Sequence, residues 1–125
     1  EWIEVDRWKK LVWNAAFNPI SVLDGGRTTT QILEDCVLKS MVVGVMSEIV
    51  MLADCHGVRL PDDIIDRNIS DTVKMAPYKT SMLLDMEQGR PLELEAILGN
   101  VVRMGDVFDV DIPYLRMLYQ RLIIV

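Results

Sequence analysis

The stretch "MVVGVMSEIVMLA", from Met41 to Ala53, decides the fold that we expect. A helix built from these residues is apolar on nearly every side, and a helix of that kind is buried by others packed around it. The run carries Glu48 in its middle and is shorter than the ~20 apolar residues of a membrane span. We therefore expect the central helix of an all-α domain, and not a membrane anchor.

This central helix is expected to be the second half of one long helix. Thr28 to Thr30 offer side chains that can cap its start, and Gly57 follows His56 where a left-handed residue closes a helix. Helical periodicity dominates on both sides, and no alternating run bounded by hairpin turns indicates a strand. We predict a bundle of roughly six helices around the buried central one. They cover residues 7–19, 28–56, 61–76, 81–88, 91–108 and 113–125.

The composition excludes several classes of function. The 125 residues make one domain of ordinary size, half of it hydrophobic, with a net charge of −6. An acidic chain lacks the basic face that nucleic acids and anionic membranes attract, so we expect neither as a partner. One histidine and two cysteines without metal-ligand spacing predict no metal site. Reduced cysteines, and the lack of a secretory signal in "EWIEVDRWKK", predict a cytoplasmic location.

A stripe of polar residues follows the first expected helix. Lys10, Asn14 and Asn18 recur every four residues, so they lie on one face of a helix. A solvated face explains any such stripe, but asparagine is a poor residue for an exposed helix interior. Asn18 also directly precedes Pro19, where the helix is expected to break or kink. Three donor-rich side chains in line could instead hold a carbonyl or carboxylate group, and both interpretations stay open.

A second polar group surrounds a break between two expected helices, in "TSMLLDMEQGRPLELEAILG". Ser81, or Thr80 beside it, can cap the helix that begins there, and a hydroxyl at a helix start is also suited to an anion. Glu93 would be the third residue of a helix begun by Pro91, where a carboxylate favours the helix dipole. A capping box would need Ser or Thr where Arg90 stands, so capping explains Glu93 incompletely.

The two polar groups resemble a known pattern when "RWKKLVWNAAFNPISVL" and "KTSMLLDMEQGRPLELEAILG" are taken together. They resemble the C-terminal domain of the ketopantoate reductase family, the NADPH-dependent 2-dehydropantoate 2-reductases. The family pattern has Lys-Leu, Asn and Asn-Pro, then Ser-Met, Asp, Arg, and a Glu before a Gly. The matching residues are Lys10, Leu11, Asn14, Asn18, Pro19, Ser81, Met82, Asp85, Arg90, Glu93 and Gly99. Leu98 departs from the asparagine that family members often carry there, which could signal a different substrate pocket.

The resemblance implies a fold like the all-helical C-terminal domain of 6-phosphogluconate dehydrogenase relatives, and it implies roles for both polar groups. Lys10 would be the general acid that protonates the keto oxygen of the substrate. Glu93, the second catalytic residue, would orient the substrate hydroxyl or tune the lysine. The carboxylate and hydroxyl of the substrate would be held by Asn14, Asn18 and Ser81. An ammonium beside a developing alkoxide stabilises charge that is larger in the transition state than in the ground state.

The resemblance also implies a second domain. NADPH would be bound mainly by an N-terminal Rossmann domain before Glu1, because residues 1–125 contain no G-x-G-x-x-G after a strand. We therefore expect residues 1–125 to be a single C-terminal substrate and catalytic domain, with no cofactor-binding residues assigned. The isolated chain is expected neither to bind NADPH tightly nor to turn over.

Three functions stay open on the sequence. The first is the reduction of ketopantoate, a small 2-keto acid, to pantoate in pantothenate biosynthesis. The second is a paralogous reductase for another bulky 2-keto acid. The third is a non-catalytic helical dimerisation module, which the long apolar helix and the apolar end "LIIV" favour, and a homodimer is left open throughout. Whether Lys9 or Lys10 faces the substrate also stays open.

Overall fold

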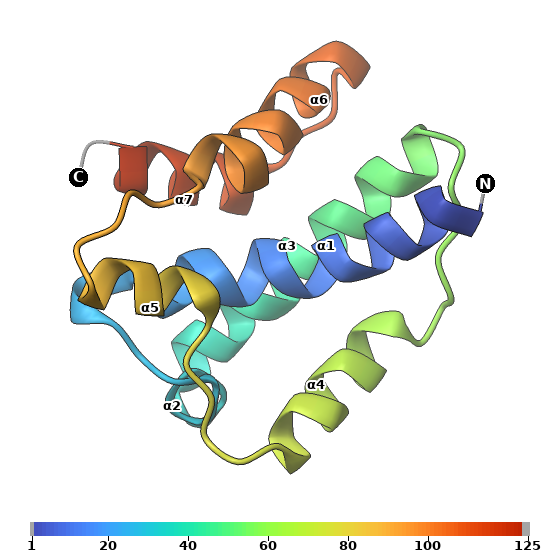
Figure 1. Ribbon diagram of the computed structural model, residues 1–125. Coiled ribbons are helices and arrows are strands. Elements are labelled where there is room, and N and C mark those ends of the chain that lie inside the picture. Colours follow the sequence, from blue (N-terminus) through green and yellow to red (C-terminus); the bar gives the residue numbers. More distant parts are fainter. Residues whose placement is uncertain (1, 124–125) are drawn as a thin grey trace.

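The computed structural model describes residues 2–123, and every regular element in that range is a helix or a helical turn (Figure 1). The all-α prediction is confirmed. In chain order the elements are α1 (Trp2–Ser21), the 3-10 turn η1 (Leu23–Gly25), α2 (Thr29–Glu34), α3 (Cys36–Cys55), α4 (Ile64–Lys74), α5 (Ser81–Glu87), the π-helical turn η2 (Glu95–Gly99), α6 (Asn100–Phe108) and α7 (Pro113–Ile123).

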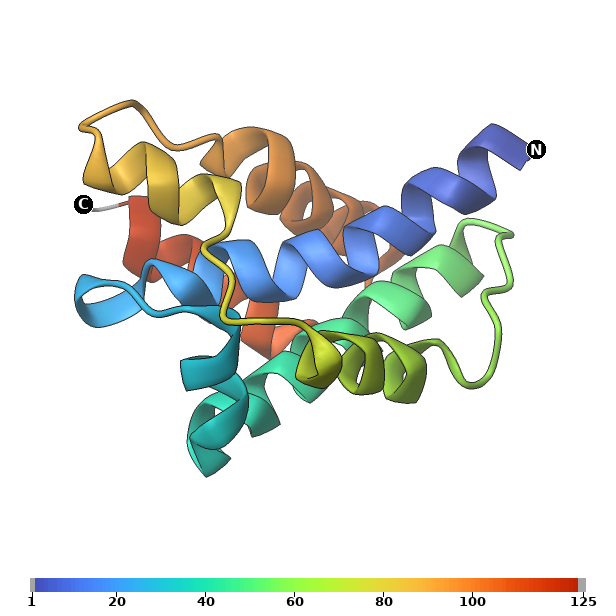
Figure 2. The same cartoon turned by 60° about the horizontal axis from the view of Figure 1, so that its bottom comes forward.

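Helices α1 and α3 form the centre of the molecule. Figures 1 and 2 both place α1 between α6 on one side and α4 on the other. Helix α3 contacts α1, α2, α4, α6 and α7, so the predicted central helix is confirmed. Its inward side chains are fully buried, among them Val42, Val45, Met46, Ile49 and Leu52.

Helix α3 is also long and apolar enough to cross a membrane, judged by length and composition alone. Burial of a core helix explains the same composition. The expectation that α3 is wrapped on nearly every side holds only in part, because Val43 and Met51 on its outer face remain exposed.

The single long helix expected over residues 28–56 is instead two helices, α2 and α3, separated at Asp35. The Asp35 backbone is extended, with φ −95° and ψ 119°, and its carboxylate accepts hydrogen bonds from Val37 N at 2.9 Å and Leu38 N at 3.0 Å. An aspartate that satisfies two free N–H groups begins a new helix. The expected caps at the outer ends, Thr28 and Gly57, are confirmed by a capping box and by a φ of 85°.

The structure decides two helix starts in the second half of the chain. Of the two candidate caps of α5, Thr80 is the one used, because its hydroxyl accepts from Leu83 N at 3.1 Å. The helix expected from Pro91 begins only at Leu94, so Glu93 lies outside it. Glu93 immediately precedes the helix, and its backbone oxygen accepts a hydrogen bond from Ile97 N at 3.3 Å in the first turn.

Glu48 joins the centre of the fold to the last helix. It is 5% exposed, and its carboxylate accepts hydrogen bonds from Tyr114 N at 2.9 Å and Leu115 N at 2.8 Å. These are free N–H groups of the first turn of α7, so Glu48 caps that helix from α3. Burial raises the pKa of the Glu48 carboxyl, although the two N–H groups act in the opposite direction.

Candidate functional site

The predicted stripe of Lys10, Asn14 and Asn18 lies on one helix, because α1 continues past Pro19 to Ser21. The solvent exposure of the three side chains falls along the helix. Lys10 is exposed, Asn14 is partly buried, and Asn18 is only 3% exposed. A stripe that ends in a buried amide is more than a solvated face, since a buried polar group needs a partner.

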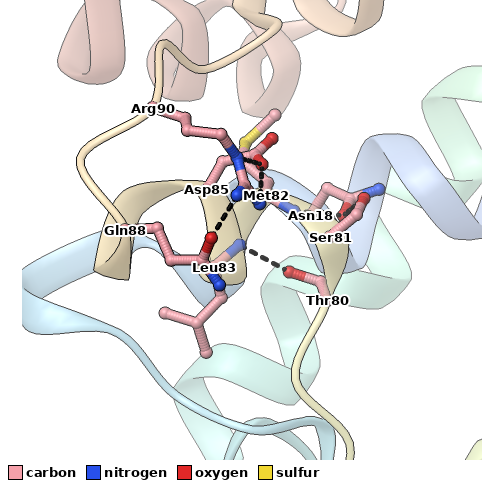
Figure 3. A network of polar contacts seen from close by, with 8 residues as sticks. All are labelled: Asn18, Thr80, Ser81, Met82, Leu83, Asp85, Gln88 and Arg90. Carbon is pink, nitrogen blue, oxygen red and sulfur yellow. Dashed lines mark hydrogen bonds and ion pairs between the residues drawn. The ribbon is translucent and has the colours of Figure 1, made fainter.

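Asn18 meets the start of α5, as Figure 3 shows. Its Oδ1 accepts from Ser81 Oγ at 3.5 Å and from Met82 N at 3.4 Å, across 63 and 64 positions of sequence. Both distances are long for hydrogen bonds, so these contacts orient the amide more than they stabilise it. Two of the predicted substrate-binding residues, Asn18 and Ser81, are therefore brought together by the fold.

The amide nitrogen of Asn18 is left without a partner among the described residues. No fully buried side-chain nitrogen or oxygen in that part of the chain lacks a hydrogen bond, so Nδ2 keeps contact with solvent. Asn18 is thus a buried residue whose acceptor is used internally and whose donor faces outward. A carboxylate or carbonyl oxygen outside the chain would complete its hydrogen bonds.

The other predicted site residues also have polar groups that the fold leaves unused. Within residues 2–123, the side chains of Lys10, Asn14 and Glu93 make no hydrogen bond or ion pair. Lys9 instead lines a small hollow of about 180 Å³ beside α4, together with Asn68 and Asp71. Because α1 is one helix and Lys10 is spaced four and eight residues from Asn14 and Asn18, Lys10 lies on their face of the helix and Lys9 does not.

Glu93 lines a large cavity of about 1050 Å³ between η1, the ends of α5 and α7, and the segment that leads into η2. Its wall is mainly apolar, with Leu23, Met86 and Leu122 among the lining residues. Lys10, Asn14, Asn18 and Ser81 do not line this cavity. The structure thus joins Asn18 to Ser81, while the pairing of Glu93 with Lys10 stays a prediction.

The segment between Ser81 and Glu93 is held by contacts that the sequence did not reveal. Gly89 adopts a φ of 72°, which reverses the chain after α5. Arg90 then folds back, and its Nε and Nη2 both lie 2.8 Å from Asp85 Oδ1, while Arg90 N donates to the Asp85 backbone oxygen at 2.8 Å (Figure 3). Because two guanidinium N–H groups of Arg90 contact the Asp85 carboxylate, the orientation of the Arg90 side chain is held as well as its distance from Asp85.

Glu95 is a second acidic residue of the cavity wall, and the sequence reasoning missed it. Tyr119 Oη donates to its carboxylate at 2.5 Å, and Arg103 Nη1 lies 2.9 Å from the other oxygen. The hydrogen bond from Tyr119, followed by that from Arg103, lowers the pKa of Glu95. Glu95 is therefore occupied by partners from α6 and α7, whereas Glu93 is free to contact a ligand. No sequence spacing indicates this pairing, because it depends on how α7 packs.

Comparison with known proteins places these residues in a family. Residues 3–124 match the family model described as "Ketopantoate reductase PanE/ApbA C terminal". The chain belongs to this family. The 2-dehydropantoate 2-reductase of Nostoc sp. is 40% identical over 116 residues, which are 93% of this chain and 36% of that protein.

Solved structures of ketopantoate reductases have the same fold. The 2-dehydropantoate 2-reductase of Methylococcus capsulatus is 48% identical, with a TM-score of 0.91 over 96% of this chain and 38% of that one. The dimeric ketopantoate reductase of Staphylococcus aureus is 26% identical, with a TM-score of 0.88 over 96% of this chain and 42% of that one. The chain thus spans little more than a third of the length of these reductases.

Leu98, the departure from the family pattern, is fully buried in the hydrophobic core and does not line the large cavity. Its side chain packs inside the domain, so the substitution does not reshape that cavity wall. Whether Leu98 signals a different substrate pocket stays a prediction, because the predicted substrate-binding residues Asn18 and Ser81 do not line this cavity either.

Proposed function

We propose that this chain is the substrate-binding and catalytic half of an NADPH-dependent 2-dehydropantoate 2-reductase, which reduces ketopantoate to pantoate. The observation that carries the proposal is the outward-facing amide donor of buried Asn18, next to Ser81 and on the same helix face as Lys10. Family membership and the names of the most similar relatives support the choice of substrate.

In this proposal, Asn18 and Ser81 bind the substrate carboxylate, and Asn14 lies one helical turn nearer to Lys10. Each step of four residues along α1 advances by about 6 Å, so a keto acid of a few carbons can contact both asparagines within reach of Lys10. Asparagine and serine donate hydrogen bonds without adding charge, and the Ser81 hydroxyl gives up its long contact with Asn18 Oδ1 in order to do so. They orient the acid while the ammonium of Lys10 stays available for the keto oxygen.

Lys10 is the proposed general acid. Its ammonium donates a proton to the keto oxygen as that oxygen gains negative charge, and it stabilises this charge more in the transition state than in the bound ketone. NADPH supplies the hydride. The described residues form no β-α-β unit that would hold a dinucleotide, so we assign its binding to a Rossmann domain outside this chain. Glu93 is proposed to orient the substrate hydroxyl.

A substitution of Lys10 in the full-length reductase tests the proposal. Lys10→Ala is expected to lower kcat for ketopantoate by about 10²- to 10⁴-fold, the usual contribution of a positioned general acid. Lys9→Ala is the matched control, since it removes the same charge from the neighbouring position and should change kcat less than about twofold. If Lys10→Ala retains full turnover, the catalytic role is wrong and a purely structural helical module becomes the better interpretation.

The substrate needs its own experiment. The wild-type full-length protein should show its highest kcat/KM for ketopantoate within a panel of branched and bulky 2-keto acids. A clear preference for another member of the panel would favour the paralogous reductase.

The Staphylococcus aureus relative is a dimer, so we also propose that the full-length protein forms a homodimer, which its mass in solution tests.

A further inference from the structure

Two hydroxyl groups are buried together where α1 meets α5. Ser21 is in the last turn of α1, Thr80 caps α5, and both are completely inaccessible to solvent. Their side-chain oxygens lie 2.6 Å apart, although 59 positions of sequence separate them. Neither residue was a predicted site residue, and neither touches the large cavity.

The available protons decide the direction of this hydrogen bond. The Ser21 hydroxyl donates to the backbone oxygen of Asn18 at 2.7 Å, which uses its only proton. Thr80 must therefore donate to Ser21, while Thr80 Oγ1 accepts from Leu83 N at 3.1 Å. The result is a continuous chain from Leu83 through Thr80 and Ser21 to Asn18, in which every hydroxyl proton is used.

This hydroxyl chain ties the backbone of Asn18 to the first turn of α5. The same turn carries Ser81 and Met82, whose side-chain hydroxyl and backbone N–H contact the Asn18 amide oxygen. Those two contacts are long and would not hold α5 in place by themselves. The short, buried bond between Ser21 and Thr80 lies three residues from Asn18 and one from Ser81, so it joins α1 to α5 directly beside that pair.

We propose that Ser21 and Thr80 are positioning residues for the 2-keto acid. They touch no substrate atom, but they hold Asn18 and Ser81 at a fixed separation. Asn18 Nδ2 and the Ser81 hydroxyl, once it is released from its long contact with Asn18 Oδ1, can then both bind one carboxylate. The inference rests on the proposed function, because it gives Asn18 and Ser81 a carboxylate to bind.

Substitutions in the full-length reductase test this role through the KM for ketopantoate. Thr80→Val keeps the shape of the side chain and removes the hydroxyl, and we expect KM to rise about tenfold with kcat within about twofold. Thr80→Ser restores the hydroxyl and should return KM to within about twofold of the wild-type value. Ser21→Ala leaves the cap on Leu83 intact and breaks only the link to α1, so it should raise KM in the same way.

A matched control separates positioning from a general decrease in stability. Thr72 is buried, accepts from Trp13 Nε1 at 3.0 Å and donates to the Asn68 backbone oxygen at 2.6 Å, so its hydroxyl makes similar hydrogen bonds away from Asn18. Thr72→Val should lower thermal stability in the way that Thr80→Val does, but leave KM unchanged. An equal rise in KM in both variants would overturn the positioning role.

Combination with Asn18→Ala distinguishes a failure of this inference from a failure of the proposed function. If Thr80 acts through Asn18, Thr80→Val should raise KM in the wild-type background and add nothing in the Asn18→Ala background. If the rise in KM in the double variant equals the product of the rises in the two single variants, the two residues act independently and the inference is overturned. Asn18→Ala with an unchanged KM would instead overturn the proposed substrate site itself.

Discussion

At the scale of single residues, the sequence pointed to Asn18 because asparagine is costly inside an exposed helix. The structure gives a different reason for the residue. Asn18 is buried, its amide oxygen is used by the start of α5, and its amide nitrogen is left to face outward. Because only the amide oxygen of Asn18 is used within the chain, its amide nitrogen can donate a hydrogen bond to an oxygen of a ligand.

Asn18→Ala in the full-length reductase should therefore weaken the binding of ketopantoate more than it weakens the fold. We expect KM to rise about tenfold or more, because a hydrogen bond to a charged group is worth about 1.5–3 kcal/mol. The two internal hydrogen bonds of the Asn18 side chain are long, so the melting temperature should fall only slightly when they are removed. Steady-state kinetics and a thermal melt measure the two effects. Asn68→Ala, which removes a half-buried amide from α4, is the control and should leave KM unchanged.

At the scale of elements, Glu48 shows how a residue of the central helix determines where another helix starts. Its carboxylate satisfies Tyr114 N and Leu115 N at the first turn of α7. Glu48→Ala would leave these N–H groups without their partner. We expect the free energy of unfolding to fall by about 1–3 kcal/mol, as measured by urea denaturation. Glu34→Ala, an exposed glutamate on α2, should change it by less than about 0.5 kcal/mol.

The pKa of Glu48 predicts a pH dependence of stability. Burial raises this pKa in the folded chain above its ordinary value of 4.5. Between that value and the higher folded pKa, the folded chain keeps a proton that the unfolded chain has released. The contribution of Glu48 to stability therefore falls as pH rises through this window. Glu48→Gln carries no titrating proton, so its unfolding free energy should lack this decline. An identical pH profile in both proteins would contradict the prediction.

At the scale of the whole molecule, the chain is a folded helical domain that spans little more than a third of related reductases. The isolated chain should show a helical circular dichroism spectrum and a cooperative melt, since it has a continuous core of its own. It should neither bind NADPH tightly nor oxidise it with ketopantoate, whereas the full-length protein should do both. Turnover by the isolated chain would show that the described residues already hold the dinucleotide.

Features with a local signal could be predicted from the sequence. Helical periodicity, the caps at Thr28 and Gly57, and the four-residue stripe on α1 all depend on neighbours within a turn or two. Two helix boundaries could not: at Asp35 a good cap ends one helix and begins the next, and after Pro91 the helix begins later than a proline suggests. Both errors concern boundaries at which two local preferences compete.

The sequence by itself determined that this protein is all helical, that its most apolar helix is central, and that polar residues on α1 and around α5 are candidates for one site. Only the tertiary structure decided which of them meet. Asn18 contacts Ser81, Ser21 bonds to Thr80, and Glu48 caps α7, each across 59 or more positions. Such pairings depend on the packing of the shared hydrophobic core, which sets the distance between helices that no local preference relates.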